Sequence, residues 1–345
     1  MVKRIQISAD SGTTNYTLPG SKGELTNEAG TINDTIFGQD FSSTQSGLIG
    51  WAVNANGLYK GFAGYVAKIM KSGVSTAMVG EAMSVVAGKT YKITASTKNV
   101  LDRLVEVVVK DNAVVVEAED IESVDYLFGR VTFAAGYTPT GPITMDAHYL
   151  PMTQVGGANG FTLTQTANAT DNSTYETTQA NEGHRTYEYG LRTVSLNLKG
   201  VYAISNAFVD LLRARAEMVI EINPDGSGKS AARGWFKPTS TGQSGDVGNL
   251  EEETLDLGLS VPDQEDISLP FSWMHSATTT LSMALRIALD SFESGELTHC
   301  KYLYNGTDGI EGEAIITDLS LTGGLEVMNE FTVKFQGSGL PENVS

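Results

Sequence analysis

The chain has little of what secreted scaffolds and membrane proteins depend on. It holds one cysteine, Cys300, among 345 residues, so no disulfide framework can form within a single chain. No run reaches the roughly 18 consecutive apolar residues that a membrane helix needs. The start, Met-Val-Lys-Arg-Ile-Gln-Ile-Ser, lacks the apolar region of a secretion signal. The sequence therefore predicts neither a secretion signal nor a membrane insertion.

Basic residues are also scarce. Lys and Arg total 23 against 41 Asp and Glu, which gives a net charge of −18. Such a chain repels polyphosphate through its general field, so a basic nucleic-acid-binding groove is not expected. The acidity is equally compatible with a surface past which DNA must slide without binding and with plain solubility.

The usual catalytic signatures are missing. None of the four histidines forms a His-x-x-x-His or Glu-x-x-His pair on a predicted helix, and no Gly-x-Ser-x-Gly turn occurs. His299 and Cys300 are neighbours on a predicted strand, so their side chains point to opposite faces. The segment Asn223–Ser230 ends in Gly-Lys-Ser, but Asn223 stands where a phosphate-binding loop needs glycine, and a solvated hairpin turn is the better interpretation. We expect no enzyme, no cofactor and no metal site.

Composition and periodicity favour a mainly β fold. Glycine is frequent, with 37 residues against 9 prolines, as in short strands joined by tight turns. Three segments alternate apolar and polar residues with the period of a half-buried strand; their apolar members are Val194, Leu196 and Leu198, then Leu255, Leu257 and Leu259, then Phe331, Val333 and Phe335. Lys110–Asn112 lies between two valine-rich runs and predicts a hairpin.

Two short helices are predicted. The first begins after Ser205 as N-cap, with Phe208, Leu211 and Leu212 on one face. The second carries apolar residues at the i, i+3, i+4, i+7 and i+8 positions from Leu281 to Leu289.

The sequence contains an internal similarity. Gly47–Tyr59 aligns without a gap to Gly190–Tyr202, with Gly, Leu, Asn, Gly and Tyr in common. A series of helix, strand, turn, strand, loop and strand begins near residue 205 and again near residue 278. We interpret this as a duplicated β unit with one discontinuous copy. Two consecutive domains split near residue 150, or a chance likeness of strand motifs, are the alternatives.

The duplication predicts three regions. Residues 1–65 with 265–345 form the first, discontinuous unit, residues 66–150 an additional β-rich unit, and residues 151–264 the second copy. Residues 10–46 are polar and too long for an ordinary turn, so we expect a flexible arm or a segment that orders only against a neighbouring subunit. Its candidate contact residues are Asp34, Thr35, Phe37 and Phe41.

One segment contains many acidic residues and no basic ones. No Lys or Arg occurs between Lys237 and Arg286, whereas Glu251, Glu252, Glu253 and Asp256 all fall inside it. A solvated acidic loop is the simplest interpretation of most of these residues. The sharper hypothesis is that these four line a lumen or meet basic residues of an adjacent subunit.

Several segments resemble the major tail tube proteins of long-tailed, siphovirus-type bacteriophages. The similarity is spread over much of the chain and lies in Gly190–Gly200, Met218–Asn223, Arg233–Pro238, Gly242–Glu253, Phe331–Gly339, and the stretch from Ser123–Phe133 to Tyr149–Pro151. It implies a duplicated tail-tube-type β-sandwich or barrel unit with one short helix per copy, plus the additional β-rich unit.

The resemblance also implies a structural virion protein rather than an enzyme. Such a subunit self-assembles into rings that stack into the hollow tail tube through which DNA is ejected. Two units per chain favour trimeric, pseudo-hexameric rings, with hexameric rings as the alternative. The expected partners are the chain itself, a tape-measure protein and other tail proteins, with DNA as cargo that does not stick. The expected location is the virion tail, and the host cytoplasm during assembly.

Two other functions stay open. The chain could be another tail ring component, a terminator or a distal-tail adaptor, which would form single rings. It could also be a carbohydrate-binding or decoration β module, for which residues 66–150 would serve.

Overall fold

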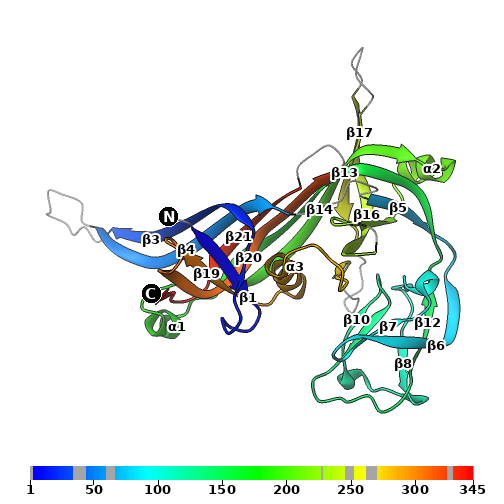
Figure 1. Ribbon diagram of the computed structural model, residues 1–345, viewed down its shortest axis with the longest axis horizontal. Helices are drawn as coiled ribbons and strands as arrows, with labels where there is room; N and C mark the ends of the chain where they lie inside the picture. The colour runs from blue at the N-terminus through cyan, green and yellow to red at the C-terminus, as the bar shows by residue number, and fades with distance from the viewer. Residues whose placement is uncertain are drawn as a thin grey trace. The chain divides into compact units, whose positions relative to one another are not determined.

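The computed structural model describes residues 3–33, 44–59, 67–226, 228–244, 252–261, 270–324 and 329–344. The described chain is mainly β, with antiparallel strands and three short α-helices (Figure 1). It divides into two compact units, of which unit 1 comprises Met1–Phe62, Thr162–Leu196 and Thr278–Ser345, and unit 2 comprises Ala63–Phe161 and Asn197–Ala277. The three-region division expected from the sequence stays a prediction.

Unit 1 brings the two ends of the chain together. Its strands are β1 (Arg4–Ser8), β2 (Tyr16–Thr17), β3 (Gly20–Asn33), β4 (Thr44–Leu58), β19 (Thr298–Leu303), β20 (Gly309–Gly324), β21 (Glu330–Gly337) and β22 (Glu342–Val344). Neighbouring strands pair in the order β3-β4-β21-β20-β19-β1-β2, and β22 pairs with the start of β20. All of these pairs are antiparallel, although β1 and β19 are almost 300 residues apart in sequence.

The inward face of this sheet is apolar because its strands alternate. On β21, Phe331, Val333 and Phe335 are buried while the residues between them face outward. The helix α3 (Met283–Ser294) contacts β20 and β1 through its buried residues, which include Leu285 and Leu289. Its predicted apolar face is confirmed, and the Ser282 hydroxyl accepts a hydrogen bond from the backbone N–H of Leu285, 3.2 Å away, as an N-cap should.

Two strands contribute residues to both units. They are β13 (Met152–Asp171) and β14 (Tyr187–Ala203), and the helix α1 (Tyr175–Ala180) lies between them in the sequence. No helix is predicted at α1 from the sequence; it begins with a capping box between Thr174 and Thr177. Within unit 1, the part of β13 from Thr162 adjoins β20, where the Thr162 and Thr322 hydroxyl oxygens are 3.4 Å apart.

Unit 2 contains a further series of antiparallel strands, which belongs to the same hydrogen-bonded sheet as the strands of unit 1. Its members besides β13 and β14 are β5 (Ala67–Ser72), β15 (Met218–Ile222), β16 (Ala231–Ser244), β17 (Glu252–Leu259) and β18 (Phe271–Met274). They follow the order β14-β17-β16-β15-β5-β13, and β18 pairs with the start of β16. The helix α2 (Asn206–Ala214) begins after Ser205, as expected, and buries Phe208 and Leu211.

Between β5 and β13 the chain forms a smaller antiparallel sheet with its own core, which we call the insert (residues 76–149). Its strands are β6 (Thr76–Ala87), β7 (Thr90–Ile93), β8 (Val108–Asp111), β9 (Val114–Val115), β10 (Ile121–Asp125), β11 (Arg130–Phe133) and β12 (Ile143–Tyr149), with short 3-10 turns at Ser96–Lys98 and Ala118–Asp120. They pair in the order β10-β11-β7-β6-β12-β8-β9 and enclose a core that includes Leu101, Val131 and Met145. The predicted hairpin at Lys110–Asn112 is present as β8 and β9.

Two half-buried arginines join the insert to the rest of unit 2. Arg233 on β16 donates to the Leu127 carbonyl at 2.9 Å and lies 4.6 Å from the centre of the Phe128 ring. Arg130 on β11 donates to the Trp273 carbonyl at 2.7 Å. Phe128, buried to 1% exposure, packs in a cluster with residues of the other sheet, among them Trp235.

Two expectations from the sequence are wrong for the described residues. Residues 20–33 of the expected arm are ordered without a neighbouring subunit, because they form β3 and pair along their length with β4. The turn at Asn223–Ser230 does join β15 to β16, but of its described residues only Gly228 is exposed and Lys229 half-buried, whereas Asn223, Asp225 and Ser230 are buried. Asp225 Oδ1 accepts from the Ser230 N–H at 2.9 Å. The burial of the turn was not expected because buried polar groups can satisfy one another by hydrogen bonding.

Candidate assembly surface

The strand β3 is a long open edge. Among the described strands it pairs only with β4, from Gly20 opposite Gly57 to Asn33 opposite Thr44. Figure 1 shows β3 and β4 side by side as an extended hairpin. Asn27 and Ala29 on β3 are exposed. An unpaired edge of this length presents a row of backbone N–H and C=O groups to any strand that approaches it.

The second half of β16 is a further open edge. Its first half pairs with β15 and β18, but from Lys237 to Ser244 the described partner is β17 alone. Lys237, Thr239, Ser240 and Thr241 are exposed. Pro238, which lacks an N–H, is a residue that sheets tolerate mainly at edges and bulges, and the register of β16 against β17 shifts beside it.

The outward face of the unit 1 sheet is polar. Asn54 on β4 is opposite Lys334 on β21, and Lys334 is opposite Asp318 on β20. The Lys334 ammonium and the Asp318 carboxylate are 2.9 Å apart. Asp318 follows a register shift of β20 against β21. This row crosses three neighbouring strands of one sheet.

A matching polar row lies in unit 2. The Asp256 carboxylate on β17 accepts from the Ser240 hydroxyl of β16 and from the Asn197 amide of β14, each at 2.5 Å. These hydrogen bonds, Ser240 first, hold the pKa of Asp256 below its ordinary range, so the carboxylate stays charged. Ser240 also follows a register shift, that of β16 against β17.

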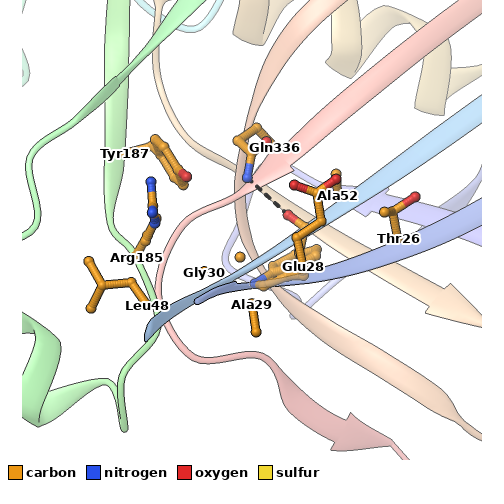
Figure 2. Close-up of a pocket in the computed structure, with 11 residues that line it drawn as sticks. Thr26, Glu28, Ala29, Gly30, Leu48, Ala52, Arg185, Tyr187 and Gln336 are labelled. Atoms are coloured by element: carbon orange, nitrogen blue, oxygen red, sulfur yellow. Dashed lines mark hydrogen bonds between the residues drawn. The ribbon is translucent and has the colours of Figure 1, made fainter. Parts of the chain in front are cut away.

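A polar cavity of about 240 Å³ opens beside the β3–β4 hairpin in unit 1. Figure 2 shows Arg185 and Tyr187 on one side of it and Thr26 and Glu28 on the other. Gln336 donates from its amide to the Trp51 carbonyl at 3.1 Å, and Arg185 forms an ion pair with Asp171 at 3.2 Å. The mixed donors and acceptors of this cavity suit a polar chain segment rather than an apolar ligand.

The residues proposed from the sequence fall partly outside the described ranges. Five of them lie outside the described residues: Asp34, Thr35, Phe37, Phe41 and Glu251. Glu252 begins β17, and Glu253 is opposite Gln243 on β16. Asp256 is in the polar row, so the structure brings it together with Asn197 and Ser240, which the sequence did not single out. The signal that could have found Asn197 was its alignment with Asn54 in the internal similarity.

Among the described residues, no group of three or more His, Cys, Asp or Glu side chains has a geometry that could hold a metal ion. His299 on β19 lies near Glu313 and Glu311, at 3.2 and 3.5 Å, whereas the neighbouring Cys300 is fully buried on the other side of the strand. Burial raises the pKa of the Cys300 thiol, which stays protonated. None of the described helices is long and apolar enough to span a bilayer.

No protein-family model matches the sequence, and no curated protein matches it.

Proposed function

We propose that the chain is a structural subunit that assembles with copies of itself into stacked rings forming a hollow tube, the tail tube of a long-tailed bacteriophage. The observation that carries this proposal is the presence of two long open strand edges, β3 and the second half of β16, at different places in one chain. Two different edges on one subunit support head-to-tail association, which generates rings or filaments.

A duplicated unit is part of the proposal, and the strand pairing supports it. β4 lies between β3 and β21, and β14 lies between β13 and β17. β20 pairs with β21, β19 and β22, and β16 correspondingly pairs with β17, β15 and β18. The two series therefore share one order of strands. They differ in chain order, because β3 and β4 come from the start of the chain and β19 to β22 from its end, whereas β13 to β18 follow one another.

Local details of the two series also correspond. The helix α2 ends at Arg215 in the left-handed conformation and β15 begins at Met218, while α3 ends at Gly295 in the same conformation and β19 begins at Thr298. The spacing is the same. The polar rows Asn54–Lys334–Asp318 and Asn197–Asp256–Ser240 occupy equivalent strands, and each ends beside a register shift. Bulges of this kind are conserved features of a fold rather than accidents.

Two copies per chain would make three chains a pseudo-six-fold ring. The polar faces that carry the two rows are suited to a wetted wall, and the net charge of −18 keeps such a wall from retaining DNA. We propose that Asp256 and the acidic residues before it contribute to this wall. The insert, with a core of its own, would then decorate the subunit rather than line the lumen.

Negative-stain electron microscopy of the purified protein, over a range of concentration and salt, tests the proposal. We expect stacked rings or hollow tubes, and native mass spectrometry of single rings should give three chains. Six chains per ring would overturn the duplicated arrangement while leaving the tube. Single rings that never stack would favour a terminator or adaptor ring, and a monomer under every condition would contradict the proposed function.

A further inference from the structure

The duplicated pattern assigns a specific partner to each open edge. We infer that β3 of one copy pairs with the second half of β16 of a second copy, in antiparallel fashion, with Asn27 opposite Thr241. This inference rests on the proposed self-assembly and names the surfaces that perform it.

In the second copy of the duplicated pattern, the strand that corresponds to β3 is β13. Glu28 on β3 is opposite Gly50 on β4, and Gly50 aligns with Thr193 in the internal similarity. The Thr193 hydroxyl lies 2.7 Å from the Thr166 hydroxyl of β13. Thr166 therefore corresponds to Glu28, and by the same count Gln165 corresponds to Asn27.

The strand that corresponds to the open half of β16 is β20. Ser240 and Asp318 occupy the same position, because each follows the register shift and is opposite the middle member of its polar row. Counting one residue further, Thr241 on β16 corresponds to Leu319 on β20.

These two corresponding strands, β13 and β20, already adjoin within unit 1. The part of β13 from Thr162 lies beside β20, and the contact between Thr162 and Thr322 fixes the count. We take Thr162 and Thr322 as opposite residues and count in the antiparallel sense of the neighbouring pairs β13–β5 and β20–β21, which places Gln165 opposite Leu319. The chain thus contains one example of the contact that β3 and β16 would form between copies.

The difference in burial between the paired strands β13 and β20 and the open strands β3 and β16 is consistent with a further strand covering the open ones. Leu163, Gln165 and Leu319 are fully buried where β13 and β20 adjoin. The corresponding residues on the open edges are half-buried at Leu25 and exposed at Asn27 and Thr241. A second copy would cover the same positions that β13 and β20 cover for each other. The polar side chains at Asn27 and Thr241 keep the open edges soluble until a copy with the complementary edge arrives.

Cysteine cross-linking tests the pairing. Residues opposite each other on antiparallel strands have Cα separations that a disulfide can span. In the variant Asn27→Cys/Thr241→Cys, mild oxidation should give a ladder of covalent multimers on non-reducing gels, with loss of the single-chain band. Each single substitution is the first control, and Val85→Cys/Thr241→Cys is the second, because Val85 is 59% exposed on β6 of the insert. Cys300 is fully buried and should not contribute.

The outcomes separate the pairing from the proposed function. Tubes in the microscope without a ladder specific to Asn27→Cys/Thr241→Cys would overturn the pairing and leave the tube. No rings and no ladder would overturn both.

A charge pair gives a second test that does not depend on oxidation. The variant Asn27→Asp/Thr241→Asp places like charges opposite each other and should lose ring formation, whereas Asn27→Asp/Thr241→Lys should restore it. Circular dichroism of both variants checks that each is folded. Equal ring formation by the two variants would contradict the pairing.

Discussion

At the residue scale, the Trp51 ring packs directly against Gly337. A methyl group added at Gly337 would lie 1.9 Å from the Trp51 indole, which is 2% exposed and donates to the Gly339 carbonyl at 3.1 Å. The Gly337→Ala variant must therefore displace a buried aromatic ring. We expect a loss of about 1–3 kcal/mol in the free energy of unfolding, measured by urea denaturation.

Gly136→Ala is the matched control for this substitution. A methyl group at Gly136 would meet no atom within 4 Å. Its effect should stay within about 0.5 kcal/mol. If both variants were equally stable, the position of the Trp51 ring over Gly337 would be wrong.

At the element scale, the β8–β9 hairpin has a turn that its sequence does not favour. Asn112 and Ala113 both have positive φ, 49° and 66°, as a two-residue hairpin turn of the mirror type requires. Asparagine tolerates this conformation, but alanine is strained in it by its Cβ. We expect Ala113→Gly to raise the free energy of unfolding by about 1 kcal/mol, measured by thermal and urea denaturation.

Ala135→Gly provides the comparison, since Ala135 is an exposed loop residue without positive φ. There the added backbone freedom of the unfolded chain should lower stability slightly or leave it unchanged. A hairpin turn of another type would be indicated if Ala113→Gly behaved like Ala135→Gly.

At the scale of the whole molecule, one buried carboxylate links three strands of unit 2 and, through Arg233, the insert. Glu221 on β15 bonds Lys68 on β5 at 2.6 Å and Arg233 on β16 at 2.7 Å. Burial alone would raise the pKa of Glu221, but Arg233 and Lys68 outweigh it, so the pKa lies below its ordinary value of 4.5. A carboxyl of this kind stabilises the fold above its ordinary pKa, and the contribution is lost as the pH falls through the lowered value.

We therefore expect the free energy of unfolding to fall on acidification below about pH 4.5, the ordinary value for this carboxyl. The Glu221→Gln variant should be less stable by about 1–3 kcal/mol at pH 7 and should lose less stability on acidification. Urea denaturation of both proteins between neutral and acidic pH measures this. Parallel pH profiles for the two proteins would show that Glu221 does not carry the effect.

Much of the local structure could be predicted from the sequence. Alternation along β21 identified Phe331, Val333 and Phe335 as buried, and the spacing of Leu281 to Leu289 identified α3, because a side chain's direction follows from the period of its own element. The strand β3 was missed for the same reason. Its sequence, Gly-Ser-Lys-Gly-Glu-Leu-Thr-Asn-Glu-Ala-Gly-Thr-Ile-Asn, has no apolar period to detect.

The sequence by itself determined which residues are apolar on which face of a strand or helix, where α2 begins, and that two segments of the chain resemble each other. Only the tertiary structure decided that β1 pairs with β19 and that β5 lies between β15 and β13. It also decided that β3 and half of β16 keep open edges among the strands that are described. The physical reason is that backbone hydrogen bonds between strands are the same for every sequence. The choice of neighbour therefore depends on how all the apolar faces are buried together, which no single segment encodes.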